Sequence, residues 1–344
     1  LRYGFPIHDR VGGQRTRLLF YDGSLSLMEA TANAMLQFTE NSFREELLNK
    51  YFKDDAVMEA EAARIEVVAP AAKEPLVPVM AAAAPAASGL AAISEERTKS
   101  HPCFSCGACS TSARLHLPIA PLCNLSCNYC LRKYDCVNES RPGVTTAVLT
   151  PAQAFDHFMR VKHDMPNLTV VGIAGPGDTL ANPEATFRTL EMIRAEDPAI
   201  TFCMSTNGLA LPDHVETIKR FNVDHVTITM NAIDAHVGAD IYDWVYFDGQ
   251  RLRGKSAAQA LIDQQMEGMY RLIEQGVLVK VNSVLIPGVN DAHLPEVSEA
   301  IRRAGAFLHN VMPLISKPEH GTYFGLNGQR EPTPEEVTQV RDSC

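Results

Sequence analysis

From about residue 113 onward, the chain alternates short apolar runs with amphipathic stretches. Apolar runs rich in β-branched residues predict strands, and apolar residues spaced three or four apart predict helices. Prolines or acidic residues open several of the amphipathic stretches, which is typical of helix N-termini. The predicted strands are 115–121, 168–174, 200–205, 225–230, 277–285 and 307–312, and the predicted helices are 151–163, 183–196, 212–221, 257–275 and 292–304.

Repeated βα units of this kind predict an α/β fold with a parallel sheet. Six units are fewer than a full barrel contains, so we expect a partial (βα)6 TIM-like barrel with its chemistry at the carboxyl ends of the strands. Residues 1–50 read as a short fragment with one helix, and residues 51–96 are rich in Ala, Pro and Val. That composition predicts a semi-extended linker, because it buries too little surface to offset the entropy of ordering. Residues 97–344 are left as the main domain.

The composition is that of an ordinary globular protein, with 46% hydrophobic and 21% charged residues among 344. A formal net charge of −10 without a basic stripe argues against a nucleic-acid partner. No apolar run approaches the roughly 18 residues of a membrane-spanning helix, and no secretory signal is evident. We therefore expect a cytoplasmic protein without a membrane partner.

Nine cysteines without an export signal favour metal or redox chemistry over disulfides. Seven of them lie between Cys103 and Cys136, in a stretch rich in Gly, Pro and Asn. Within it, the segment CNLSCNYC places Cys123, Cys127 and Cys130 directly after the first predicted strand. Three thiolates on one tight loop can hold three irons of a [4Fe–4S] cube and leave the fourth iron open.

An open iron can chelate S-adenosyl-L-methionine (SAM), and one electron from the cluster then cleaves SAM to a 5′-deoxyadenosyl radical. The triad therefore predicts a radical SAM enzyme in which these three cysteines are both metal ligands and catalytic. A zinc knuckle is the alternative, although zinc sites usually present four ligands in paired motifs.

Small and polar residues gather at the ends of the later predicted strands, where a barrel binds its ligand. The glycines of GIAGPGD (172–178) allow close approach of the backbone to a ligand, and the tyrosine within CNLSCNYC can pack on an adenine. Taken singly, each feature is also explained by ordinary turn chemistry. The predicted SAM contacts are Tyr129, Gly175, Gly177, Asp178, Ser205, Asn207, Asn231, Asn282 and Ser283.

Motifs spread over about residues 97–344 include HPCFS (101–105), ARLHLPIAPLCNLSCNYC (113–130), GIAGPGDTLANP (172–183) and VKVNSVLIPGVND (279–291). With them the sequence resembles the NifB proteins of nitrogenase cofactor assembly. The resemblance implies an enzyme that fuses two [4Fe–4S] substrate clusters around a SAM-derived carbide, adds a sulfide and forms the eight-iron precursor NifB-co. One SAM would donate a methyl group, and a second would supply the radical that abstracts a methyl hydrogen. The implied partners are a NifE/NifN-type scaffold that receives the product, an Fe–S cluster donor and a low-potential electron donor.

The resemblance also implies ligands for the accessory clusters. Glu139 and His116 fall at motif positions whose carboxylate and imidazole are exchangeable ligands, which suits a cluster that must leave after fusion. The family usually has His in the stretch after HPC, whereas this chain has Cys106 and Cys109 there. These two thiols are candidate replacement ligands. The implied accessory-cluster cysteines are Cys103, Cys136, Cys203 and Cys344.

The beginning of the chain resembles a second protein. The motif GFPIHDRVGGQ (4–14) resembles the C-terminal end of a NifN scaffold subunit, so we expect a fragment of a NifN–NifB fusion. Two other functions stay open for the main domain. A radical SAM maturase of a peptide or other substrate predicts a Cys-rich C-terminal extension, and a non-catalytic Fe–S scaffold or carrier needs no SAM site.

Overall fold

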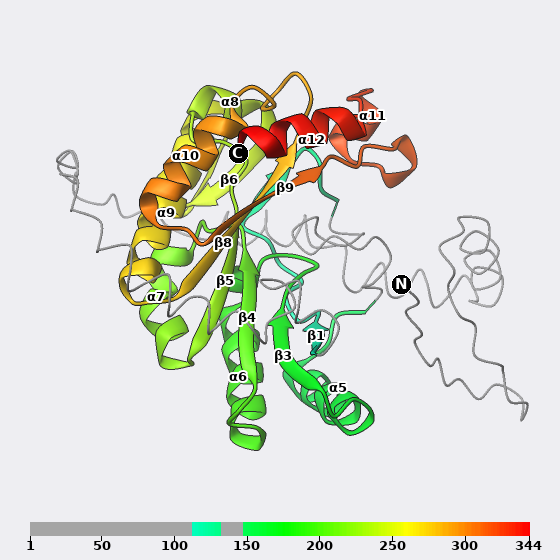
Figure 1. Cartoon of the computed structure of the whole chain (residues 1–344), viewed down its shortest axis with the longest axis vertical. Coiled ribbons are helices and arrows are strands. Elements are labelled where there is room, and N and C mark those ends of the chain that lie inside the picture. The colour runs from blue at the N-terminus through cyan, green and yellow to red at the C-terminus, as the bar shows by residue number, and fades with distance from the viewer. Residues whose placement is uncertain (1–111, 132–146) are drawn as a thin grey trace, which may run out of the picture. The chain divides into compact units, whose positions relative to one another are not determined.

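The fold is built on six parallel strands. The computed structural model describes residues 112–131 and 147–344. Every neighbouring pair of strands in the large sheet is parallel, and within the described residues the outer strands do not pair with each other (Figure 1). The sheet is therefore a curled partial barrel, which confirms the predicted fold class. Its strands, in spatial order, are β1 (Ala113–Leu117), β3 (Leu168–Ile173), β4 (Thr201–Thr206), β5 (Val223–Thr229), β8 (Leu278–Leu285) and β9 (Leu308–Pro313).

Helices fill the connections between these strands, as parallel pairing requires, and all five predicted helices are present. Helix α5 starts with a capping box, in which the Thr150 hydroxyl accepts from the Gln153 N–H and the Gln153 side chain accepts from the Thr150 N–H. None of the described helices is long and apolar enough to cross a membrane. The helices are α5 (Pro151–Asp164), α6 (Pro183–Glu196), α7 (Leu211–Arg220), α9 (Gly254–Glu274), α10 (Leu294–Ala304) and α12 (Pro334–Ser343).

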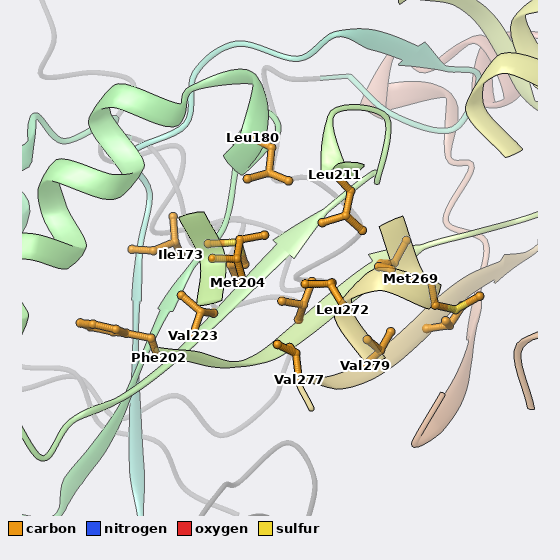
Figure 2. Close-up of a cluster of buried hydrophobic side chains, with 14 of the residues drawn as sticks. Ile173, Leu180, Phe202, Met204, Leu211, Val223, Met269, Leu272, Val277 and Val279 are labelled. Atoms are coloured by element: carbon orange, nitrogen blue, oxygen red, sulfur yellow. The ribbon is translucent and has the colours of Figure 1, made fainter. Parts of the chain in front are cut away.

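The main core lies between the sheet and its helices. Figure 2 shows Phe202 and Met204 of β4 in this core, with Leu211 of α7 among their fully buried neighbours. Burial of each such side chain stabilises the fold by about 1.5–3 kcal/mol. Because successive strand residues point to opposite faces, Cys203 and Ser205 face the barrel interior instead. One strand thus supplies the core on one face and candidate site residues on the other.

A small antiparallel sheet, which the sequence pattern did not predict, has the order β2-β6-β7. Its first strand, β2 (Leu125–Cys127), belongs to the CNLSCNYC segment. The other two, β6 (Tyr242–Phe247) and β7 (Gln250–Leu252), follow α8 (Ala235–Ile241) in the β5–β8 connection. Their turn has positive φ at Asp248 (51°) and Gly249 (73°), as tight hairpins favour. This small sheet joins the triad loop to a segment more than a hundred residues later.

The remaining described elements are short. They are η2 (Thr179–Ala181), η3 (Pro318–His320) and α11 (Tyr323–Leu326). The predicted fragment 1–50 and linker 51–96 lie outside the described residues, so the division into three regions stays a prediction.

Candidate functional site

The three triad cysteines lie on the loop after β1 and line one pocket, with each residue partly exposed. Among the described residues, no three metal-binding side chains converge on one point. Three thiols that line one pocket can supply the three ligands of a [4Fe–4S] cluster. The pocket is lined by Cys123, Leu125, Ser126, Cys127, Tyr129, Cys130, Leu131, Pro176, Gly177, Asp178, Asn207, Thr229, Tyr242 and Leu261.

Backbone pairing fixes the triad loop against β6. Strand β2 runs antiparallel to β6 and places Cys127 opposite Tyr242. Beyond the two ends of β2, the Tyr246 N–H donates to the Asn124 carbonyl and the Asn128 N–H donates to the residue before β6, both over 2.8 Å. The positions of the thiols are therefore set by main-chain hydrogen bonds as well as by the loop's own turns.

Asn207, at the end of β4, lies against the same loop. Its Nδ2 donates to Asn124 Oδ1 over 2.7 Å and lies 3.6 Å from Cys123 Sγ. Its Oδ1 accepts from the Leu209 N–H over 2.9 Å, which fixes the orientation of the amide. Asn207 lines the pocket and holds the first cysteine of the triad, and its contact with SAM stays a prediction.

The glycine-rich loop after β3 packs on the segment that enters the triad loop. A Cβ on Gly177 would lie 2.1 Å from the Leu122 carbonyl oxygen, so only glycine fits there. The Gly177 N–H donates to Ala120 and the Asp178 N–H donates to Leu122, over 2.6 and 2.8 Å. Gly177 and Asp178 line the pocket, whereas Gly175 is not among its lining residues. The closest neighbours of Gly177 are therefore main-chain atoms of the chain itself.

Asp178 is buried and its carboxylate is fully engaged inside the protein. One oxygen accepts from the N–H groups of Leu180 and Ala181 and from the Thr206 hydroxyl, and the other accepts from the Asn207 N–H over 2.5 Å. Burial raises the pKa of Asp178, and these four hydrogen bonds oppose that shift. The carboxylate thus ties the glycine-rich loop to the end of β4.

Asn231, after β5, connects two pocket tyrosines. Its Nδ2 donates to the hydroxyl oxygens of Tyr129 (2.8 Å) and Tyr242 (3.2 Å), and its Oδ1 accepts from the Val284 N–H (2.8 Å). Burial raises the pKa of the Tyr242 phenol, and the nearby Cys127 thiol raises it further. Tyr129, a predicted SAM contact, lines the pocket, and Tyr242 is a further pocket residue that the sequence analysis did not single out.

Asn231 is not among the residues that line this pocket, and neither are three other predicted SAM contacts, Ser205, Asn282 and Ser283. The Ser205 carbonyl accepts from the Thr179 hydroxyl over 2.6 Å. Asn282 Oδ1 accepts from the Asn310 amide over 3.1 Å. The Ser283 hydroxyl donates to a main-chain carbonyl and lies 2.9 Å from the Nε2 of a β9 histidine. Contact of these residues with SAM stays a prediction.

A row of polar residues crosses the barrel interior, earlier along the strands than the pocket. The parallel register aligns His116 with Gly172, Gly172 with Cys203, and Cys203 with His225. A Cβ on Gly172 would lie 2.7 Å from the His116 ring, so this glycine leaves room for the imidazole. The structure thus brings two predicted accessory ligands, His116 and Cys203, to one face. His225 was not predicted, although its interior position follows from the alternation of β5.

Cys344 lies elsewhere, at the end of α12, where its carbonyl accepts from the Ser298 hydroxyl of α10 over 2.7 Å. The structure thus places it where α12 meets α10, and its role as an accessory-cluster ligand stays a prediction. The other predicted accessory residues lie outside the described residues. They are Cys103, Cys106, Cys109, Cys136 and Glu139.

Comparison with known proteins assigns this site to a family. The model of the radical SAM superfamily matches residues 117–301, which is more than half of the chain. The chain belongs to the radical SAM superfamily. Membership implies a [4Fe–4S] cluster and SAM, and the three partly exposed thiols of one pocket fit that cluster.

This radical SAM chain is also similar to proteins named FeMo cofactor biosynthesis protein NifB, in agreement with the resemblance seen in its motifs. The protein from Herbaspirillum seropedicae is 56% identical over 249 residues, which is 72% of this chain and 47% of that protein. The protein from Klebsiella pneumoniae is 54% identical over 257 residues, which is 75% of this chain and 55% of that protein. The chain spans about half the length of the curated relatives it matches.

Among solved structures, Streptococcus suis SuiB bound to S-adenosylmethionine is similar with a TM-score of 0.49 and 12% identity, over 72% of this chain and 49% of that chain. A radical SAM methyltransferase from Sphaerobacter thermophilus is similar with a TM-score of 0.47 and 19% identity, over 67% of this chain and 61% of that chain.

Proposed function

We propose that this radical SAM chain carries the catalytic domain of a NifB-type cofactor-assembly enzyme. It would fuse two [4Fe–4S] clusters, with insertion of a SAM-derived carbide and a sulfide, to form NifB-co. The observation that carries the proposal is the identity of more than half of the aligned residues to proteins named FeMo cofactor biosynthesis protein NifB. The reaction would combine SAM-dependent methyl transfer with radical hydrogen abstraction.

The pocket supports this proposal through the placement of its residues. Cys123, Cys127 and Cys130 would hold the cluster, which supplies the electron for cleavage of SAM when bound. Tyr129 is 3% exposed and is oriented by Asn231, so its ring is held as a flat apolar wall beside the thiols. Pinning these groups before a ligand arrives reduces the entropy lost on binding.

The interior row supports a place for the substrate clusters. Cys203 is 4% exposed and lies in register with His225 on one neighbouring strand and, across Gly172 of the other, with His116, away from the core that stabilises the sheet. Cysteine sulfur and histidine nitrogen are both ligand types that suit iron–sulfur clusters. In the proposal, Cys103, Cys136 and Glu139 complete the set, and a low-potential electron donor, an Fe–S cluster donor and a NifE/NifN-type scaffold act as partners.

Anaerobic reconstitution tests the proposal. The protein is loaded with iron and sulfide, its iron is counted, and SAM and dithionite are added. We expect about twelve irons per chain, from three four-iron clusters, together with 5′-deoxyadenosine and S-adenosylhomocysteine. The variant Cys127→Ala is the matched control, because it should lose SAM cleavage while leaving the interior row unchanged.

Two results would point to other functions. About four irons with deoxyadenosine alone would favour a radical SAM maturase acting on a peptide or another substrate. Cluster loading without any SAM product would favour an Fe–S scaffold or carrier. Either result would overturn the proposed cluster fusion.

A further inference from the structure

Asn231 is a fully buried amide whose orientation is decided by its partners. The Val284 N–H can only donate, so the side-chain atom that it contacts must be the carbonyl oxygen. The amide nitrogen then faces the two tyrosines, and its two N–H groups are used by the Tyr129 and Tyr242 oxygens. The Asn290 side chain holds the Asn231 carbonyl over 3.0 Å, so the main chain is fixed as well.

This arrangement determines what the Tyr242 hydroxyl can do. Its oxygen accepts from the side-chain N–H of Asn231 and also from the Asn231 backbone N–H. A phenol oxygen offers about two lone pairs and one proton. Because the two N–H groups of Asn231 occupy the lone pairs of the Tyr242 oxygen, the hydroxyl can interact with other partners through its proton.

The surroundings of Tyr242 point that proton toward the triad. Tyr242 lies directly opposite Cys127 in the β2–β6 pairing, and side chains of residues so paired lie on the same face about 5 Å apart at Cβ. Both residues line the pocket. The tyrosine is only 4% exposed, so water does not compete freely for the proton.

We propose that the Tyr242 hydroxyl, held by Asn231, donates a hydrogen bond to a sulfur of the bound cluster at its Cys127 corner. The inference rests on the proposed radical SAM function of this pocket. A donor to a cluster sulfur stabilises the reduced, more negative cluster and so raises its reduction potential. Tyr242 is thus a residue that tunes how readily the cluster accepts the electron used for SAM cleavage.

The test is an EPR-monitored redox titration of the reconstituted full chain and its Tyr242→Phe variant. The signal that changes on addition of SAM identifies the cluster with the open iron. Phe keeps the ring and removes only the hydroxyl. We therefore expect the ratio of reduced to oxidised cluster at a fixed potential to fall roughly tenfold. For one electron, this corresponds to a decrease in the reduction potential of about 59 mV. Tyr246→Phe is the matched control, because Tyr246 lies on the same strand but is 38% exposed and outside the pocket. It should titrate like the wild type.

The outcomes separate this inference from the proposed function. If the wild-type chain gives no SAM-sensitive cluster signal, both the proposed function and the role of Tyr242 are refuted. A wild-type chain with that signal, and a Tyr242→Phe variant with an unchanged potential, would remove only the role of Tyr242. If Tyr242→Phe does not retain its cluster, hyperfine spectroscopy of the wild type in D2O decides instead. An exchangeable hydron coupled to the SAM-sensitive cluster supports the hydrogen bond, and its absence overturns it.

Discussion

Gly177 provides the sharpest test of how the glycine-rich loop supports the triad. In Gly177→Ala the new Cβ would meet main-chain atoms of Leu122, at 2.1 Å from the oxygen and 2.5 Å from the carbonyl carbon. Main-chain atoms cannot rotate away, so the two segments must separate. Their separation weakens the hydrogen bonds from Gly177 to Ala120 and from Asp178 to Leu122, each worth about 1 kcal/mol. Overpacking adds about 1–3 kcal/mol, so we expect a total loss of about 4 kcal/mol.

The assay is urea unfolding of the cluster-free protein. Trp244 is the only tryptophan in the sequence and lies opposite the triad loop in the β2–β6 pairing, so its fluorescence reports on this region. Gly276→Ala is the control, because its φ of +76° costs about 1–2 kcal/mol but its Cβ would meet open space. Equal urea midpoints for Gly177→Ala and Gly276→Ala would refute the reasoning.

Three further predictions concern single side chains. Burial lowers the pKa of His309 to about 4, below the ordinary value of about 6.5, so protonation favours the unfolded chain. The contribution of neutral His309 to the free energy of unfolding is complete above about pH 6.5 and is lost as the pH falls toward 4, by up to about 3 kcal/mol. The urea midpoint of His309→Gln should therefore fall less than that of the wild type between pH 7 and about pH 5. An equal fall in both proteins would contradict this. Asp178→Asn replaces a carboxylate that accepts four hydrogen bonds with an amide whose nitrogen can only donate. The free energy of unfolding should therefore fall by about 2–4 kcal/mol, and an unchanged urea midpoint would contradict this. His116→Ala and Glu139→Ala should each lower the yield of NifB-co in the reconstituted reaction, whereas the exposed His236→Ala should not; full yield in the first two would remove them as cluster ligands.

The strands and helices were predictable where one element presents one apolar face to the core. The run predicted at 277–285 is the observed β8, Leu278–Leu285, and prolines mark the starts of α5 and α6 as expected. The β6–β7 hairpin was missed because it lies within a βα connection and breaks the repeating pattern. Its signal was nevertheless present, since Asp248–Gly249 directly follows the aromatic and β-branched run at 244–247.

The hydrogen-bond partners of individual polar side chains could not be predicted from the sequence. The triad was recognisable because its three cysteines are close together in the chain. Asn231 was predicted to contact SAM, which stays a prediction. Its amide contacts Tyr129 and Tyr242, which come from segments 102 residues before and 11 residues after it. Spacing along a chain does not show which of several distant groups an amide meets, so its role became clear only from the folded contacts.

The pairing of β2 with β6 has a consequence for the order of events in the cell. The Asn128 side chain of the triad loop bonds to the Asp240 carbonyl, 112 residues later. During synthesis, at about 5–20 residues per second, the three thiols leave the ribosome several seconds before the strand that fixes them exists. In that interval the backbone partners that position the triad loop are absent. The triad loop can therefore take its described position only after residues 240–247 have been translated.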